Sequence, residues 1–450
     1  MSANRFRWSH YVGTSTRWLL GGKSGPAATA QTVLTKVLVL GLNVATGVIT
    51  ARELGPDGRG SQAAMLLWPQ FLAFAMTLGL PSATLYNLRR HPEDRSSLFA
   101  ALLILGMLLG CTATATGVLF IPLWLANYPP DIIHTAQWFM VAAPVSLLAL
   151  TFTSALEALD AFHLSNLERF LQPLLTLCGL VGLLLTGTLT PFTSALAYLM
   201  PILPLFLWRL VYLWIRLRPR WVKLKTSFQR LVSYGVRSYG IDLAGTLAAQ
   251  IDQVLVVGLL NPYHMGMYAV ALSLSRVLNI FQAAIATVLF PRLAARPPAE
   301  VVAVTGQAVR VSTALSLLVA GSVVLVGPVV LHLLYGPEYA EAVAVFRILV
   351  VEVVLGGAVL VLAQTFMALG KPGAVTIWQT VGLGLSVPLL LLLIPAFGLV
   401  GAGLALLCST GARLLLMLLS YPLVLKIPPP SLVLTRDDLR LLTRLLPHQP

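Results

Sequence analysis

Apolar residues run through most of the chain in long blocks that short polar turns separate. Between about residue 26 and about residue 425, most blocks reach the roughly 20 residues that a helix needs to cross the hydrocarbon core of a bilayer. None of them alternates apolar and polar residues in the manner of a strand of a membrane barrel. Because every backbone N–H and C=O must be satisfied inside lipid, the pattern predicts transmembrane helices.

We predict twelve such helices in two lobes, joined by short connections. They cover residues 30–52, 61–87, 97–125, 132–158, 165–187, 192–215, 231–260, 265–291, 305–334, 340–369, 374–395 and 399–424. The composition agrees, since only 10% of the residues are charged, 57% are hydrophobic and the mean hydropathy is +0.85. The predicted fold class is therefore an all-α polytopic membrane protein.

Lys and Arg fall mainly on one side of the predicted membrane. With residue 1 placed inside, the outside connections carry only Arg52 and Arg59, which lie in the same short turn as Glu53 and Asp57. The positive-inside rule then places both termini in the cytoplasm. The net charge of +14 is mostly this topology signal, so the expected partners are anionic lipid headgroups and not nucleic acid.

The turn ELGPDGRG at residues 53–60 allows two interpretations. It is either a tight connection shaped by glycine and proline, whose charges neutralise one another, or a gate that touches substrate. The first interpretation is the simpler one, and it predicts a sharp backbone turn with local ion pairs.

The chain repeats itself at an offset of 206 to 207 residues. LGPDGRGSQA at residues 54–63 matches LNPYHMGMYA at residues 260–269, which places Pro56 on Pro262 and Gly60 on Gly266. Other pairs agree with this offset: Tyr128 with Tyr335, Phe139 with Phe346, Gln172 with Gln379 and Gln70 with Arg276. Each half holds an even number of predicted helices, so the repeat is parallel and predicts two six-helix lobes that rock about a shared site.

The predicted lobes divide the chain into five parts. These are a basic cytoplasmic arm (1–29), an N-terminal lobe (30–215), a basic cytoplasmic linker (216–230), a C-terminal lobe (231–425) and a cytoplasmic tail with a short amphipathic helix (426–450). No cleavable signal peptide is apparent in the arm, because it has no apolar core followed by a cleavage site.

Ionisable and amide side chains interrupt several predicted spans. A charge at the bilayer centre costs at least about 2.5 to 3.5 kcal/mol, so these residues should face a polar interior. The basic candidates are Lys36, Arg237 and Arg276, with Arg209, Arg347 and Arg413 as further cations; the amides are Asn43, Gln70, Asn279 and Gln282; the acids are Asp242, Asp252 and Glu352. The cations are in excess, which favours an anionic substrate such as a phosphate or pyrophosphate. The alternative is that these residues simply pair with one another.

No cofactor or metal site is predicted. Cys111, Cys178 and Cys408 lie inside predicted spans without metal-ligand spacing, and we interpret them as small packing residues. GGKS at residues 21–24 lacks the earlier glycine and the preceding strand of a P-loop.

Several motifs together resemble a family of transporters. They are LGPDGRG (54–60), LLNPYHMGMYAVALSLSRV (259–277), FPRLA (290–294), LYGPEYAEAVAVFRIL (334–349), GKP (370–372) and FGLVGAGLA (397–405). From about residue 30 to residue 425 the chain resembles polysaccharide transporters, the branch of O-antigen-type lipid-linked oligosaccharide flippases in the multidrug/oligosaccharidyl-lipid/polysaccharide exporter superfamily. The resemblance implies a V-shaped exporter fold in a bacterial cytoplasmic (inner) membrane.

The resemblance also implies a function and roles for residues. The protein is expected to move an undecaprenyl-pyrophosphate-linked oligosaccharide repeat unit across the membrane by alternating access, as a transporter and not as an enzyme. Lys36, Arg237 and Arg276 would meet the pyrophosphate, the four amides would offer hydrogen bonds to sugars, and the three acids are candidates for coupling to a proton or a sodium ion.

Three rival functions differ in what they require. A cation-coupled drug or metabolite exporter of the same superfamily predicts an acidic cavity, which the excess of cations disfavours. A membrane-embedded glycan polymerase or ligase predicts a long external loop, and none is visible in the sequence. A scaffold built on the same fold without transport is the third.

Overall fold

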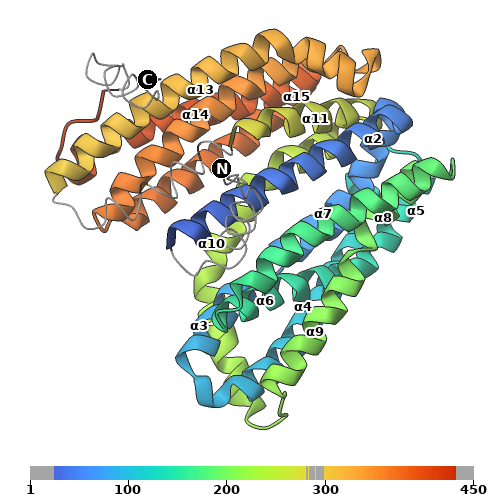
Figure 1. Cartoon of the computed structure of the whole chain (residues 1–450), viewed down its shortest axis with the longest axis vertical. Coiled ribbons are helices and arrows are strands. Elements are labelled where there is room, and N and C mark those ends of the chain that lie inside the picture. The colour runs from blue at the N-terminus through green and yellow to red at the C-terminus, as the bar shows by residue number, and fades with distance from the viewer. Residues whose placement is uncertain (1–24, 280–281, 283–288, 290–297, 432–450) are drawn as a thin grey trace, which may run out of the picture.

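The computed structural model describes residues 25–279, 282, 289 and 298–431, without the side chains of residues 25–36, 241, 298, 299 and 372. Over this part of the chain the structure is helical and contains no strand (Figure 1). The α-helices are α2 (Gly25–Ala75), α3 (Leu80–Arg90), α4 (Arg95–Trp124), α5 (Pro130–Phe139), α6 (Ala143–Ala158), α7 (Phe162–Leu185), α8 (Pro191–Leu199), α9 (Ile202–Leu217), α10 (Leu224–Leu259), α11 (Pro262–Ser275), α13 (Pro298–Tyr335), α14 (Ala342–Ala368) and α15 (Pro372–Ser420). Short helical turns are η1 (Pro92–Asp94), η2 (Met140–Ala142), η3 (Arg276–Leu278), η4 (Pro337–Tyr339) and the π-helix η5 (Tyr421–Leu425).

Two of the helices, α2 and α15, bend sharply at a glycine. Gly55 has φ 63° and ψ −179°, and Gly398 has φ 58° and ψ −134°. Glycine adopts positive φ without the steric cost of a Cβ atom, so each helix folds into two legs at this point. The predicted sharp turn at residues 53–60 is therefore confirmed, with Gly55 as its pivot.

The all-α membrane class predicted from hydropathy is confirmed. Within the described ranges, nine segments are long and apolar enough to cross a bilayer, and the segments in α2 and α15 each include both legs of a bent helix. Large apolar side chains are exposed on the outer helices, as lipid contact requires; Leu185 and Leu325 are 82% and 80% exposed. The count of twelve spans stays a prediction.

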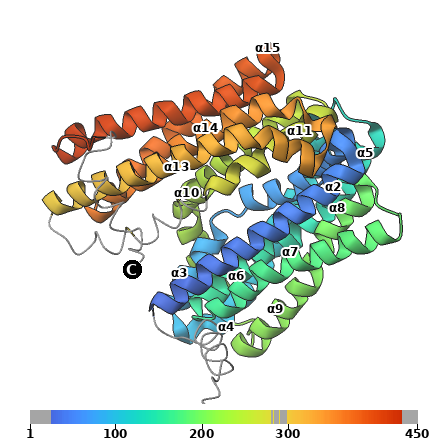
Figure 2. The ribbon, with the colours of Figure 1, turned by 45° about the horizontal axis from the view of Figure 1, so that its top comes forward.

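The helices form two lobes that meet at one end and diverge towards the other (Figure 1). One lobe holds α3 to α9, and the other holds α11, α13, α14 and α15; the same separation is visible after rotation (Figure 2). Helices α2, α10 and α11 run where the lobes meet. The molecule therefore has the V-shaped arrangement that the family resemblance implied.

The closed end of the V is a seam in which two glycines face two backbone carbonyls. A Cβ atom added at Gly60 would lie less than 3.0 Å from the carbonyl oxygen of Pro262, and one added at Gly266 would lie less than 3.0 Å from that of Pro56. These are the residues that the repeat pairs with each other, so the contact occurs twice in a reciprocal form. Helices α2 and α11 approach each other so closely because glycine has no side chain.

The sequence predicted that the charges of the turn at residues 53–60 neutralise one another, but no ion pair occurs within this turn among the described residues. Arg52 donates from Nε to the carbonyl oxygen of Leu334 at 2.9 Å and from Nη2 to that of Leu333, and Arg59 donates to Gln62. The last carbonyls of a helix have no partner within the helix, so the end of α13 attracts the Arg52 guanidinium more strongly than an exposed carboxylate does. The arginine thereby joins α2 to the opposite lobe.

The first half of α10 packs on the N-terminal lobe, against α3 and α4. Tyr239 donates to the carbonyl oxygen of Ala75 at 2.5 Å, and the rings of Tyr86 and Tyr234 stack at 4.2 Å. The second half continues to α15 in the other lobe. Helix α10 therefore links the two lobes, although the sequence prediction divides it between the linker (216–230) and the C-terminal lobe (231–425).

Two predicted boundaries differ from the helix ends. Helix α2 begins at Gly25, inside the predicted arm, and α9 and α10 leave only residues 218–223 between them. Asp94 accounts for the short linker, because its carboxylate binds Arg230 at 2.8 Å and Lys223 at 3.5 Å and so holds the start of α10. Residues 432–450, with the predicted tail helix, lie outside the described residues.

The seam predicts opposite effects for equal substitutions at different glycines of α2 and α11. Gly60→Ala and Gly266→Ala should each lower the free energy of unfolding by about 1 to 3 kcal/mol, because the new methyl group meets a backbone carbonyl that cannot move alone. Gly41→Ala is the matched control: its Cβ would meet nothing within 4 Å, so the higher helix propensity of alanine should stabilise the protein by up to about 1 kcal/mol. Thermal unfolding of the purified proteins in detergent measures all three, and equal behaviour of Gly41→Ala and Gly60→Ala would contradict the described seam.

Candidate functional site

A polar pocket in the C-terminal lobe brings together several of the candidate residues. Its volume is about 390 Å³, and helices α10, α11, α14 and α15 with η3 form its walls. The predicted residues in its lining are Asp252, Arg276, Asn279, Glu352 and Arg413. They come from four segments that are far apart in the sequence, and we call this the C-terminal pocket.

Asp252 and Arg276 form a loose ion pair at one wall of the pocket. The Nη2 atom of Arg276 lies 3.5 Å from Oδ2 of Asp252, and the same oxygen accepts a hydrogen bond of 2.7 Å from the Tyr268 hydroxyl. The Asp252 side chain is only 3% exposed, whereas that of Arg276 is 41% exposed. The carboxylate is thus held in place by a tyrosine, and the guanidinium remains accessible.

Glu352 and Arg413 are joined at the other wall through a threonine. The Thr410 hydroxyl donates to Oε1 of Glu352 at 2.7 Å and accepts from Nη2 of Arg413 at 2.8 Å. The stem of Arg413 crosses Gly382, where an added Cβ would lie less than 3.0 Å from its Cδ. Glycine at this position therefore makes room for the arginine to reach the first leg of α15.

The pocket holds two basic and two acidic side chains, so its formal charges balance. Its hydrogen bonds do not: Oδ1 of Asp252 and Nε of Arg413 are buried without a partner. A buried polar atom without a partner costs about 1 to 3 kcal/mol, so these atoms favour an occupant that supplies both donors and acceptors. The excess of cations that the sequence predicted is absent from this pocket.

The predicted amides are distributed over different places. Asn279 lines the C-terminal pocket, and Asn43 is exposed on α2. Gln282 is buried and donates to the carbonyl oxygen of Val353 at 3.1 Å, so it bonds within the C-terminal lobe and does not line that pocket. Gln70 lines a different pocket in the N-terminal lobe.

The remaining predicted residues also lie outside the C-terminal pocket. Asp242 accepts a bond from the Ser82 hydroxyl, with its two oxygens at 3.1 and 3.0 Å, and so joins α10 to α3. Arg237 and Arg347 are exposed and have no ion pair within the described ranges. Lys36 lies in α2, but its side chain is outside the described part of the chain.

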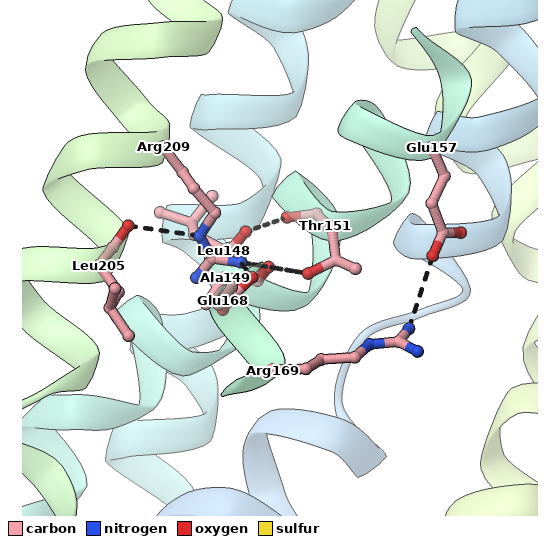
Figure 3. A network of polar contacts seen from close by, with 9 residues as sticks. Leu148, Ala149, Thr151, Glu157, Glu168, Arg169, Leu205 and Arg209 are labelled. Atoms are coloured by element: carbon pink, nitrogen blue, oxygen red, sulfur yellow. Dashed lines mark hydrogen bonds and ion pairs between the residues drawn. The ribbon is translucent and has the colours of Figure 1, made fainter. Parts of the chain in front are cut away.

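Arg209 illustrates the alternative in which buried ions simply pair. Figure 3 shows it pointing from α9 towards Glu168 of α7, beside Ala149 of α6. Its Nη1 atom donates to Glu168 at 2.6 Å, to the Ala149 carbonyl oxygen at 3.0 Å and to Thr153 at 3.1 Å. The two side chains are 2% and 13% exposed. This pair holds three helices of the N-terminal lobe together.

The sequence interpretation missed several residues that build these sites. Glu168 sits in a predicted span, and the cost of a buried carboxylate is the signal that would have marked it as the partner of Arg209. Tyr268, Thr410 and Gly382 gave no signal, because a hydroxyl or a glycine in a transmembrane helix is common. Their roles depend on which helices pack together.

The structure also informs the predictions about cysteines and metals. Cys111, Cys178 and Cys408 are free and exposed on the helix surfaces. They are therefore not packed between helices, in contrast to the prediction that they are small packing residues. No group of three metal-ligating side chains occurs in the described part of the chain. The GGKS motif at residues 21–24 lies outside it.

Comparison with known proteins gives a family and a fold. A family model described as "Polysaccharide biosynthesis protein" matches residues 49–344. A relative from Haloferax volcanii, named as the probable low-salt glycan biosynthesis flippase Agl15, is 23% identical over 188 residues. That match covers 40% of this chain and 40% of the relative, so the chain spans less than half of the relative's length.

Solved structures share the fold at low sequence identity. The lipid II flippase MurJ in an inward closed conformation superposes with a TM-score of 0.74 at 12% identity, over 88% of this chain and 87% of that one. An inward-facing multidrug resistance MATE family transporter of the MOP superfamily gives a TM-score of 0.68 at 16% identity, over 86% and 94%. A MOP superfamily transporter from Pyrococcus furiosus gives 0.60 at 15% identity, over 91% and 97%. The V-shaped exporter fold is thus shared with transporters of this superfamily.

The two ion pairs should respond differently to substitution. Glu168→Ala should lower the free energy of unfolding by about 3 to 5 kcal/mol, since it leaves the buried Arg209 guanidinium without a counter-charge. Arg276→Met should lower it by at most about 1 kcal/mol, because the contact is 3.5 Å long and the arginine is 41% exposed. Denaturant unfolding in detergent micelles compares them. Similar losses in both variants would show that Arg276 is as firmly paired as Arg209.

Proposed function

Because the chain belongs to the polysaccharide biosynthesis protein family, we propose that it is a flippase that moves a lipid-linked oligosaccharide across a membrane without changing it chemically. The fold supports this proposal, since it is shared with transporters that have two lobes around a central axis. The archaeal relative is itself named as a flippase of glycan biosynthesis. The observation that carries the proposal is a charged pocket inside a shell of lipid-exposed apolar helices.

The proposed substrate is an undecaprenyl-pyrophosphate-linked oligosaccharide repeat unit, in a bacterial cytoplasmic membrane with both termini in the cytoplasm. Its lipid tail stays in the bilayer while the polar head passes between the lobes. Only the head must then be shielded from hydrocarbon, and the protein needs polar groups only along this path.

Arg276 is the proposed contact for the pyrophosphate. Its guanidinium is accessible and has only long contacts, at 3.5 Å to Asp252 and at 3.5 Å to the carbonyl oxygen of Ala249, so an anion can compete for it. Arginine binds phosphate oxygens through paired charge-assisted hydrogen bonds, which suits a diphosphate better than a single point charge. Lys36 and Arg237 are proposed as further cations on the path, and Asn43 and Asn279 as hydrogen-bond donors to sugars. Gln282 could join them only after leaving Val353.

The lobes are proposed to alternate between two arrangements. The seam at Gly60 and Gly266 closes the end that the sequence places outside, and the lobes diverge at the other end (Figure 1). This is the arrangement that would receive a head group from the cytoplasmic leaflet. Opening the seam and closing the opposite end would release the head group outside, a rigid-body change of the kind that two-lobed transporters make.

Asp252 and Glu352 are the proposed groups for coupling to a proton or a sodium ion. They line the pocket that contains Arg276, so an anion that draws Arg276 away leaves Asp252 in need of another positive charge. Asp242 lies elsewhere and binds the Ser82 hydroxyl. Of the three predicted acids it is therefore the weakest candidate.

Reconstitution tests the substrate contact. In proteoliposomes with a labelled lipid-linked oligosaccharide, Arg276→Ala should slow translocation by at least about tenfold, because a charge-assisted hydrogen bond contributes about 1.5 to 3 kcal/mol. Arg276→Lys should retain part of the activity. Arg216→Ala, at an exposed position near the end of α9, is the matched control and should be unchanged. Translocation at the normal rate by correctly folded Arg276→Ala protein would refute the assignment of Arg276, and no translocation by the parent protein would refute the function.

Coupling is tested by imposing gradients on the same vesicles. If translocation responds to a proton or sodium gradient, Asp252→Asn and Glu352→Gln should abolish this response, since each replaces an ionisable pocket group by an amide of similar size. Asp242→Asn should keep it. A response that is lost in Asp242→Asn and kept in the other two variants would move the coupling site to the junction of α3 and α10.

A further inference from the structure

A second polar pocket lies in the N-terminal lobe, between α2, α6, α7 and α9. Its volume is about 190 Å³. The residues of its lining that matter here are Gln70, Phe74, Ser146, Glu168, Gln172 and Arg209. We call it the N-terminal pocket. Of these residues the sequence analysis assigned a substrate role only to Gln70.

The N-terminal pocket is the repeat counterpart of the C-terminal pocket. Gln70 corresponds to Arg276 at the offset of 206 residues, and Ser146 corresponds to Val353 at the offset of 207 that its neighbours in the repeat follow. Both members of each pair line their own pocket. Two duplicated cavities therefore differ in chemistry: one has an amide and a hydroxyl where the other has a guanidinium and an apolar side chain.

The charges of the N-terminal pocket are already neutralised. Arg209 and Glu168 lie 2.6 Å apart, and Arg209 also binds the Ala149 carbonyl oxygen and Thr153 through the same nitrogen (Figure 3). A phosphate would meet the Glu168 carboxylate, and a lone cation would meet the Arg209 guanidinium. The pocket is therefore unsuited to a small ion of either sign and suited to an uncharged polar group.

Several polar atoms of the lining have spare hydrogen-bonding capacity. The Ser146 residue is only 8% exposed, and its hydroxyl is buried without a hydrogen-bond partner. The contact of Glu168 with Arg209 uses Oε2 and leaves Oε1, and neither carboxamide of Gln70 and Gln172 has a hydrogen bond to another described side chain or backbone group. Donors and acceptors are thus mixed in a lining that also contains the aromatic side chain of Phe74.

We propose that the N-terminal pocket is a carbohydrate subsite that receives one sugar of the lipid-linked glycan while the pyrophosphate is bound at Arg276. This inference rests on the proposed function and adds to it the place and the chemistry of sugar recognition. Amide, hydroxyl and carboxylate groups match the hydroxyls of a sugar, and Phe74 matches its apolar face. A volume of about 190 Å³ has room for a sugar ring.

The test compares the affinities of two probes for the full-length protein in detergent. One probe is a radiolabelled lipid-pyrophosphate-linked oligosaccharide, and the other is the same lipid pyrophosphate without sugars. The ratio of their dissociation constants measures the contribution of the sugar. We expect the parent protein to prefer the sugar-bearing probe.

The variants Gln172→Ala and Gln70→Ala should reduce this preference about two- to tenfold each, as expected for the loss of one hydrogen-bonding side chain. They should leave the affinity for the sugar-free probe unchanged, which a general loss of structure would not do. Gln172→Glu keeps a hydrogen-bond acceptor and should restore part of the preference. Gln379→Ala is the matched control, because Gln379 is the repeat counterpart of Gln172 and is exposed outside the C-terminal pocket.

Three results would overturn the subsite. They are an equal affinity of the parent protein for both probes, an unchanged preference in the Gln70 and Gln172 variants, and an equal loss of both affinities in those variants. Failure of the parent protein to bind either probe would instead refute the proposed function, and the subsite with it. Melting temperatures of all variants identify any that are unfolded, and the conservative Gln172→Glu protein then decides the result.

Discussion

The close backbone contact between Gly60 and Pro262, and between Gly266 and Pro56, determines how the two lobes meet. Its two halves are related by the sequence repeat, so each lobe offers the other the same surface, as in a two-fold symmetric interface. The backbones come close because glycine has no side chain, and beside them Arg52 and Tyr339 donate hydrogen bonds to carbonyl oxygens of the opposite lobe. Such a seam holds the lobes close together, and one cluster of buried apolar residues includes members of both lobes. The V shape, the linking role of α10 and the divergence of the lobes at the other end all follow from closure at this point (Figure 1).

The distribution of buried charge fits a molecule whose lobes move as units. Arg209 and Glu168 belong to the N-terminal lobe, while Asp252, Arg276, Glu352 and Arg413 form a separate set with helices α10, α14 and α15. A charge inside a membrane is costly to separate from its partner, so ion pairs that crossed between the lobes would oppose their motion. The contacts that join α10 to the N-terminal lobe are of another kind. The Ser82 hydroxyl donates to Asp242, and the Tyr239 hydroxyl donates to a backbone carbonyl oxygen. Asp94 binds an exposed lysine and a half-buried arginine. These cost less to rearrange.

The sequence predicted the helical spans well because hydropathy and backbone satisfaction in lipid depend on local composition. It also predicted the turn at Gly55, since glycine and proline at fixed positions act locally. It could not predict that half of α10 packs on the other lobe, because this depends on the fit between Gly79 and Gly235 and on the Asp242 contact with Ser82. For the same reason the sequence identified Asp252, Arg276 and Glu352 as candidates but did not predict that they lie in one pocket. Their arrangement in one pocket required Tyr268 and Thr410, which are unremarkable in sequence.

Duplication explains why the two pockets are alike in position, and divergence explains why they differ in charge. The proposed substrate combines a phosphate head with sugars, and these two parts need different surroundings. The phosphate needs an accessible arginine, whose charge must be compensated when the phosphate leaves, whereas a sugar needs a mixture of hydrogen-bond donors and acceptors. Two related cavities in separate lobes meet these two needs. The N-terminal pocket keeps its arginine bound to Glu168, whereas the C-terminal pocket leaves Arg276 accessible and holds Asp252 ready as its counter-ion. A head group that contacts both pockets would then connect the lobes through its own covalent structure, and its passage would depend on both chemistries being present in one molecule.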